Sequence, residues 1–302
     1  MLGLSRRALL MGGLGATVVA AAGGTGYELV QHGVVPGRYR LDRALGACGA
    51  DPGVPGVAAG PVLASSFASR YREREVEMII MRPPGPDRPL PVALVLHGAG
   101  GDARSVIALG YPHYLASVTR AGATRFAVVS VDGGSSTYWH RRGDGDDPQA
   151  MLLHEVLPRL DRLGYLTRKI ALMGWSMGGY GALLLASRLG PSRVAAVVAC
   201  SPAIFSSYGA AISANSGSFD SPADFAANDI SSQPLLATLR RIPCRIDCGS
   251  SDPFAAQSAV LRTSLGRPAG AVSAGCHDQA FWRRELPAEL GFAGQHLASV
   301  RP

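Results

Sequence analysis

The pentapeptide Gly174-Trp175-Ser176-Met177-Gly178 carries the clearest chemical signal in this sequence. It fits the Gly-x-Ser-x-Gly pattern, in which a sharp turn between a strand and a helix exposes a serine hydroxyl. An apolar run precedes the pattern and a helix-like stretch follows it, as such a turn requires. Glycines flank the serine because larger side chains would clash there. We therefore predict that Ser176 is a nucleophile rather than a serine in an ordinary turn.

A serine hydroxyl is a poor nucleophile at neutral pH and needs a base that takes its proton during attack. Proteins with this turn place the acid and then the histidine after the serine in the chain. Of the seven histidines, only His277 and His296 follow Ser176. His277 comes just after an apolar run, where a loop can bring it back over a sheet, whereas His296 near the C-terminus suits a solvated surface. His277 is therefore the predicted general base.

The histidine needs a carboxylate that orients its ring, and Asp252 is the predicted partner. Asp252 follows an apolar run and precedes Pro253, so its side chain can turn inward at the end of a strand. The alternative role for this residue is a cap at the start of a helix. Asp247 lies within the expected strand, and Asp278 adjoins His277 and is poorly placed to meet its Nδ1 atom.

Acyl transfer passes through an oxyanion that needs two fixed N–H donors, each worth about 3 to 4 kcal/mol in comparable sites. One donor is expected to be the backbone amide of Met177, directly after the nucleophile. The second is expected at Ala99, in the glycine-rich turn His97-Gly98-Ala99-Gly100-Gly101-Asp102. Such a turn could instead cradle a phosphate, but no lysine follows it and no Walker spacing is present.

Alternating strands and helices are expected to position these residues. Short, continuously apolar runs rich in β-branched residues are typical of buried parallel strands. Apolar runs rich in β-branched residues, most of them continuously apolar, occur at residues 76–81, 91–96, 126–131, 170–175, 194–200, 244–248 and 271–274. Segments with helical period lie between them, at residues 150–163, 179–189 and 253–265. The sequence therefore predicts an α/β fold with a mostly parallel central sheet and helices on both faces.

Two segments break this alternation. Residues 25–75 are rich in Gly, Pro, Ala and Ser without sustained periodicity, which favours an irregular linker that wraps the domain. Residues 202–239 carry Ser, Gly, Asn and Asp with few strong helix formers, which favours a short lid inserted late in the sheet. The catalytic domain is therefore expected to span residues 76–300.

The N-terminus predicts export. Arg6 and Arg7 directly precede an apolar, glycine-containing run at residues 8–22, which is the layout of a twin-arginine signal. The alternative is an uncleaved anchor, although a run of about 15 apolar residues is short for a bilayer. Residues 1–24 are therefore expected to be an export signal or an N-terminal anchor. The protein would then be secreted or associated with the cell envelope, at the membrane or the cell wall.

Composition limits the partners. The formal charge is +7, but the arginines are scattered and Lys169 is the only lysine, so no basic stripe for nucleic acid emerges. The five cysteines show no zinc spacing, and no other metal or organic cofactor is implied. For an exported chain, a bridge between Cys248 and Cys276 and a set of buried free thiols are both open alternatives.

Residues 76–287 resemble the esterase D and mycolyltransferase-like branch of the α/β-hydrolases, a putative esterase family that includes secreted actinobacterial enzymes. The matching pieces are Leu96-His97-Gly98, the turn around Ser176, Asp252 in its loop, and Gly275-Cys276-His277 followed by Phe281-Trp282. The resemblance implies the α/β-hydrolase fold, a Ser-His-Asp triad and acyl esters as substrates.

The loop Tyr138-Trp139-His140 is similar to the family loop that borders the substrate cleft, and surface packing is its alternative role. The residues expected to contact substrate are His97, Gly98, Trp139, His140 and Trp175. The mycolyltransferases have a glutamate where Asp252 stands, and their sugar-binding residues have no match here. The resemblance therefore favours hydrolysis over mycolyl transfer.

Three functions follow from these expectations. The first is a serine carboxylic-ester hydrolase, an esterase or lipase that works through an acyl-enzyme. The second is an acyltransferase that uses the same residues to pass the acyl group to a sugar or lipid alcohol. The third is a non-catalytic envelope-binding protein that has kept a hydrolase fold.

Overall fold

A computed structural model of the chain describes residues 38–300, so the expected signal or anchor at residues 1–24 lies outside the described residues. The chain divides into two units after Ala47. The described part of the first unit contains helix α3 (Arg38–Ala44), and the second unit, which begins at Cys48, contains all other elements described below. Among the described residues, no helix combines the length and the apolar character that a membrane crossing needs.

One sheet organises the second unit. Within the described residues its eight strands lie in the order β1-β2-β4-β3-β5-β6-β7-β8. The β1–β2 and β2–β4 pairs are antiparallel, and all other neighbouring pairs are parallel. The strands are β1 (Val62–Ser69), β2 (Arg74–Met81), β3 (Pro91–Leu96), β4 (Ala127–Val131), β5 (Leu166–Trp175), β6 (Val194–Cys200), β7 (Cys244–Gly249) and β8 (Val272–Ser273).

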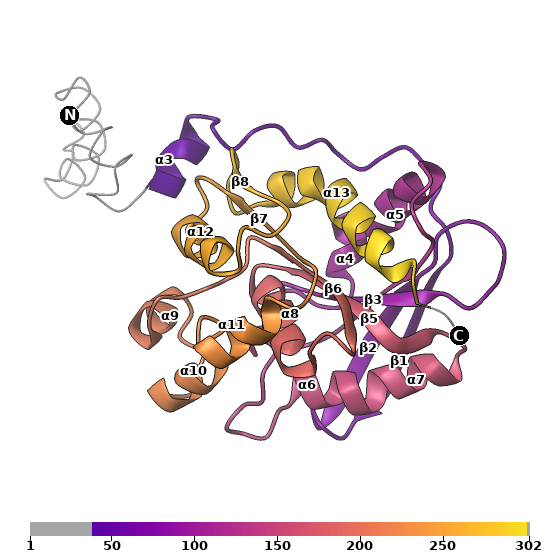
Figure 1. Ribbon diagram of the computed structural model, residues 1–302, viewed down its shortest axis with the longest axis horizontal. Helices are drawn as coiled ribbons and strands as arrows, with labels where there is room; N and C mark the ends of the chain where they lie inside the picture. Colours follow the sequence, from indigo (N-terminus) through magenta and orange to yellow (C-terminus); the bar gives the residue numbers. More distant parts are fainter. Residues whose placement is uncertain (1–37, 301–302) are drawn as a thin grey trace, which may run out of the picture. The chain divides into compact units, whose positions relative to one another are not determined.

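Helices cover both faces of this sheet (Figure 1). One face packs against α4 (Ser105–Ala108), α5 (Tyr111–Arg120) and α13 (Gln279–Leu297). The other packs against α6 (Pro148–Met151), the π-helical turn η1 (Leu152–Val156), α7 (Leu157–Arg162), α8 (Met177–Leu189), α11 (Gln233–Leu239) and α12 (Ala255–Ser264). Side chains alternate along β3, because Leu94 and Leu96 enter one apolar cluster and Ala93 and Val95 the other. This is the predicted α/β-hydrolase architecture.

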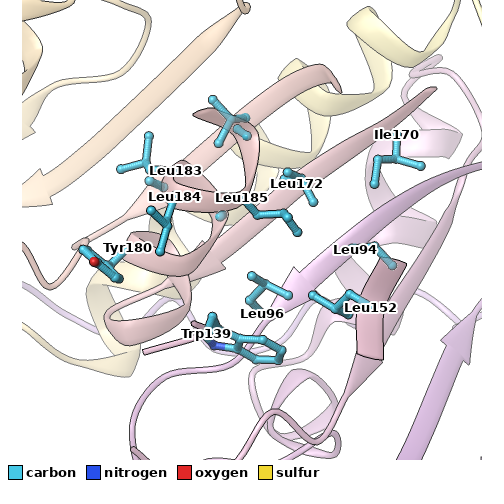
Figure 2. Close-up of a cluster of buried hydrophobic side chains, with 14 of the residues drawn as sticks. Leu94, Leu96, Trp139, Leu152, Ile170, Leu172, Tyr180, Leu183, Leu184 and Leu185 are labelled. Atoms are coloured by element: carbon cyan, nitrogen blue, oxygen red, sulfur yellow. The ribbon is translucent and has the colours of Figure 1, made fainter. Parts of the chain in front are cut away.

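The larger apolar cluster holds the strand that precedes the Ser176 turn against the helix that follows it. Figure 2 shows Leu96 and Trp139 below the side chains of α8, with Leu172 of β5 close to Leu185. All four of these side chains are buried. Burying one side chain of leucine size contributes about 1.5 to 3 kcal/mol relative to leaving it exposed. The core therefore fixes the strand-to-helix junction firmly.

The segment at residues 25–75 is more regular than expected. Its end forms the edge strand β1, and residues 38–44 form α3, so an irregular structure is the wrong prediction for both. Only Phe67 and Ser69 of β1 are buried, since the strand has one neighbour and faces solvent over most of its length. An exposed edge strand carries little of the apolar alternation from which strands are predicted.

The segment at residues 202–239 forms α9 (Tyr208–Ala214), α10 (Pro222–Asn228) and α11. Its serines, which suggest loops in the sequence, begin helices. The hydroxyl of Ser207 accepts a hydrogen bond from the Ala210 amide, and that of Ser221 accepts one from Asp224. Serine is a preferred N-cap residue because it satisfies an amide that has no partner within the helix.

Glu289 of α13 gives the fold a pH-dependent stability. Burial, and next to it the charge of Asp247, raise the pKa of the Glu289 carboxyl from 4.5 to about 8. The folded protein therefore keeps a proton that the unfolded chain releases between these two pH values. Stability from this group is fully present below the lower value and is lost as the pH rises through the upper value.

Glu289→Gln is expected to remove this contribution, because the amide is neutral at every pH and has nearly the same shape. Urea unfolding of both proteins at about pH 5, 6.5 and 8 would measure it. The variant should gain stability relative to the wild type as the pH rises. If the difference in free energy of unfolding between the two proteins stayed constant across this range, the raised pKa of Glu289 would be contradicted.

Candidate active site

Ser176 lies at the junction of β5 and α8 in a backbone conformation that few residues adopt, with φ 54° and ψ −123°. Such a conformation costs about 1 to 3 kcal/mol and persists only where surrounding contacts fix it. Here the Ser176 amide donates to the Cys200 carbonyl at 3.0 Å, and the Ala203 amide donates to the Ser176 carbonyl at 3.0 Å. A Cβ atom on Gly178 would lie 1.9 Å from the Leu96 carbonyl oxygen. Position 178 therefore has no space for a side chain, as the sequence pattern predicts.

The three side chains predicted from the sequence form one hydrogen-bonded relay. The Nε2 atom of His277 lies 2.9 Å from the Oγ atom of Ser176. The Nδ1 atom of the same ring lies 2.8 Å from the Oδ2 atom of Asp252. The residues come from separate elements, namely the β5–α8 turn, the loop after β8 and the loop after β7. The serine can therefore pass its proton to a ring that a carboxylate orients.

Asp252 takes the orienting role and does not cap α12, because the N-cap position of that helix is Phe254 and no side chain caps it. Its Oδ1 atom accepts a hydrogen bond from the Phe254 amide at 2.8 Å, which closes a turn just before α12, while Oδ2 faces His277. The Asp252 side chain is fully buried, whereas 20% of the His277 side chain is exposed. A carboxylate bound on both oxygens cannot rotate freely, so it presents Oδ2 to Nδ1 of His277 in a defined direction.

Two aromatic rings also hold His277. Phe254 and Trp282 each lie edge-to-face with the imidazole, with ring centroids 5.3 Å apart. The alternative residues are engaged elsewhere, since Asp247 pairs with Arg245 and Asp278 caps α13 through the Phe281 amide. His296 packs on Phe292 near the end of α13.

The turn after β3 lines the same cavity as Ser176 and His277 and contains Ala99, the predicted second oxyanion donor. The amides of Gly100 and Gly101 donate to the carbonyls of Ser135 and Gly98, so these two amides are already engaged. Met177 is the first residue of α8, where amide groups have no partner within the helix. The role of Ala99 and Met177 as an oxyanion hole stays a prediction.

A cavity of about 410 Å³ opens next to Ser176. Its walls are Gly98, Ala99, Gly100, Gly101, Ser105, Ala108, Leu109, Trp175, Ser176, His277, Gln279 and Trp282. Gly98 and Trp175 therefore lie where a substrate contact was expected. Leu109, Gln279 and Trp282 are wall residues that the sequence does not predict, because a family match at Trp282 does not show that its side chain faces the cavity and the segments of the other two carry no motif. No residue of the expected lid at 202–239 contributes to the described wall.

His97 does not contact the cavity directly, because its side chain is completely buried. Its Nε2 atom accepts a hydrogen bond from the Gly133 amide at 2.9 Å, so Nδ1 carries the proton and donates to the Gly98 carbonyl at 2.8 Å. Burial lowers the pKa of His97, which agrees with a neutral ring. His97 is therefore not the expected substrate contact. Its ring instead links the turn that contains Ala99 to Gly133 through two hydrogen bonds.

Trp139 and His140 are also buried rather than placed at the cavity. The Trp139 indole donates to the His97 carbonyl at 3.1 Å, and its ring packs so closely on Gly133 that a Cβ atom there would lie 2.2 Å from it. His140 stacks on Phe219 with ring centroids 5.2 Å apart. The expected substrate contacts of these two residues are therefore not found. Of the two roles considered for this loop, packing is the one observed, in the interior rather than at the surface.

The disulfide joins Cys48 to Cys276, so of the two alternatives that the sequence leaves open, the bridge between Cys248 and Cys276 is wrong. Cys248 is a buried free thiol, as are Cys200 and Cys244. Nothing in the sequence shows that the residues around Cys48 run past the His277 loop. Among the described residues, Cys48, Cys276 and Asp278 form the one group with metal-ligand geometry, and its two sulfurs are already bonded to each other.

Comparison with known proteins agrees with this architecture. The sequence profile of the putative esterase family matches residues 69–293. No curated protein sequence matches the chain. Among solved structures, a ferulic acid esterase superposes with a TM-score of 0.68 at 19% identity, covering 80% of this chain and 100% of that one.

Two further structures share the fold. An S-formylglutathione hydrolase from Agrobacterium tumefaciens superposes with a TM-score of 0.67 at 16% identity, over 82% of this chain and 99% of that one. MPT51 (FbpC1) from Mycobacterium tuberculosis superposes with a TM-score of 0.59 at 19% identity, over 80% and 100%. With the family match over most of its length, the chain belongs to the putative esterase family and is an esterase-type hydrolase with the α/β-hydrolase fold.

Proposed function

We propose that the chain is a serine carboxylic-ester hydrolase that works through an acyl-enzyme. The observation that carries this proposal is the relay from Asp252 through His277 to Ser176, with both hydrogen bonds under 3 Å. Ser176 attacks the ester carbonyl while His277 takes its proton, and the amides of Ala99 and Met177 stabilise the oxyanion. His277 then protonates the departing alcohol. Water repeats the cycle and releases the acid.

The direction of acyl transfer is the first test of this function. The protein is incubated with a nitrophenyl ester, with and without sugar or lipid alcohols as acceptors, and the products are separated by chromatography. Free acid should dominate in every mixture. Transesterified product in excess over the acid would favour the acyltransferase instead, and absence of both products would favour a non-catalytic binding protein.

We extend the proposal to the electrostatic character of the substrate. Besides His277, the described walls of the cavity hold no acidic or basic side chain. The charged side chains in the adjoining turn are engaged, because Asp102 accepts a hydrogen bond from the Ser105 amide and Arg104 pairs with Glu77. A charged group placed here would lose its hydration without gaining a partner. The substrate is therefore an ester whose group beside Ser176 is neutral.

Esters of a dicarboxylic acid test this point. A nitrophenyl ester with a free carboxylate at the far end of its acyl chain is compared with the methyl ester of the same compound. The charged ester should have a kcat/KM at least about 10-fold lower, because burial of an unpaired charge is unfavourable. Equal rates for the two esters would contradict a neutral substrate.

We also propose that the protein acts outside the cytoplasm, in the cell envelope or beyond it. The twin-arginine pattern at Arg6 and Arg7 supports this location. The Cys48–Cys276 disulfide supports it independently, since such bonds persist mainly in oxidising compartments.

A further inference from the structure

The disulfide bond attaches directly to the residue before the predicted base. Cys276 precedes His277 in the loop between β8 and α13, and its sulfur is bonded to Cys48, 228 residues earlier in the chain. Both cysteines are buried. The bridge therefore connects the start of the second unit to the backbone that presents the imidazole.

Backbone hydrogen bonds do little to fix this part of the loop. Within the described residues, neither Cys276 nor His277 takes part in a hydrogen bond between backbone groups. The neighbouring Gly275 carbonyl accepts one from the Ser251 amide at 2.9 Å, and the Ala274 carbonyl accepts one from the Arg284 side chain. These contacts hold the residues before position 276. The disulfide is the covalent link that holds position 276 itself.

The other end of the bridge is firmly anchored. Residues 48–57, here called the strap, bind α5 and α13 at three points. Asp51 pairs with Arg283 at 2.5 Å, the Gly53 carbonyl accepts a hydrogen bond from the Tyr114 hydroxyl at 2.6 Å, and the Val57 carbonyl lies 2.8 Å from Nδ1 of His113. Cys48 is thus a fixed point against which the His277 loop is held.

We propose that the Cys48–Cys276 disulfide positions His277, so that full activity requires the oxidised protein. The inference rests on the proposed esterase function. The relay depends on a 2.9 Å contact between His277 and Ser176, and a displacement of about 1 Å in a catalytic group can lower the rate about 100-fold. Without the bridge, the loop loses its attachment at position 276 and the ring samples positions away from the serine hydroxyl.

The redox state then links activity to location. In the cytosol both thiols stay reduced. In an oxidising compartment the two thiols lose two protons and two electrons to a protein disulfide oxidant, and the Sγ–Sγ bond forms. The enzyme gains its full activity only there, so hydrolysis of acyl esters inside the cytosol is restrained.

Cys48→Ser tests the inference, because it removes the bridge and leaves the His277 loop unchanged in sequence. We expect kcat to fall by about 10- to 100-fold while KM changes by less than about twofold. The rate is measured well below the unfolding temperature, with near-UV circular dichroism confirming native packing, since loss of a disulfide also lowers stability. A bridge with a purely structural role would lower the unfolding temperature and leave kcat unchanged.

Two controls complete the experiment. Asp51→Asn weakens another contact of the strap but leaves the disulfide to Cys276 intact, so kcat should stay within about twofold of the wild type.

Reduction is the second control. Dithiothreitol should inactivate the wild type, and reoxidation should restore its activity. The double variant Cys48→Ala/Cys276→Ala should not respond to either treatment, although it retains the three buried free thiols. A folded Cys48→Ser protein with wild-type kcat would overturn the positioning role. An oxidised wild type that hydrolyses no ester would overturn the proposed function and this inference with it.

Discussion

Ser176→Ala is expected to lower kcat for a nitrophenyl ester by about 10⁵-fold or more, with little change in KM. The methyl group cannot form the acyl-enzyme, and the oxyanion donors alone retain only a small part of the catalysis. Steady-state hydrolysis on protein with a native circular dichroism spectrum measures the effect. The expected loss is large because the relay converges on this one oxygen atom, at 2.9 Å from His277.

Ser105→Ala is the matched control, since Ser105 lines the same cavity but its hydroxyl accepts a hydrogen bond from the Asp102 amide instead of meeting the imidazole. This variant should keep at least about a tenth of the wild-type rate, as expected for a residue that supports the structure around the site. Comparable losses in both variants would mean that the cavity, and not the hydroxyl at position 176, determines the rate.

Asp252→Asn is expected to have the second-largest effect, lowering kcat by about 10⁴-fold. The carboxylate accepts a hydrogen bond from Nδ1–H of His277, which keeps the proton on Nδ1 and leaves Nε2 free to take the serine proton. An amide in this position can donate to Nδ1 instead, which places the proton on Nε2 and removes the base. The overall fold should be retained, because the Oδ1 contact to the Phe254 amide can persist in the asparagine.

Asp278→Asn is the control for this change, because Asp278 lies next to His277 but caps α13. Asparagine is as good a helix cap as aspartate, so activity and unfolding temperature should both stay close to wild type. If Asp278→Asn lowered kcat strongly and Asp252→Asn did not, Asp278 and not Asp252 would be the carboxylate that orients His277.

The relay could be predicted from the sequence because chain order and strand ends determine it. In a parallel sheet, residues just past the carboxyl ends of neighbouring strands meet at one edge. Ser176 follows β5, Asp252 follows β7 and His277 follows β8. Each of the three follows a segment that the sequence predicts to be a strand, at residues 170–175, 244–248 and 271–274, so the three positions could be placed without knowing how the loops fold.

The walls of the cavity could not be predicted in the same way. Leu109 and Trp282 reach it from the turn after α4 and from the first turn of α13, and neither segment has a motif that indicates a substrate. Conversely, Trp139 and His140 resemble residues of a substrate cleft in the sequence but are buried. Gly133 and Gly181 leave room for the Trp139 indole against the sheet and α8, and His140 stacks on Phe219. Aromatic residues after a strand do not by themselves show which side of the sheet edge they occupy.

The strap and its disulfide were missed for a related reason. The residues around Cys48 have no periodicity, and their positions depend on contacts with α5 and α13, which are distant in sequence. Five cysteines permit many pairings, and sequence alone does not choose among them. The pairing depends on where an irregular segment crosses the fold.

Labelling of the nucleophile tests the central claim most directly. The wild-type protein is treated with a fluorophosphonate, and the modified residue is identified by intact mass and by mapping of proteolytic peptides. We predict one adduct per chain, located on Ser176, absent in Ser176→Ala and formed in proportion to the loss of esterase activity. An adduct on another residue, or full esterase activity in protein whose Ser176 is completely labelled, would contradict the account.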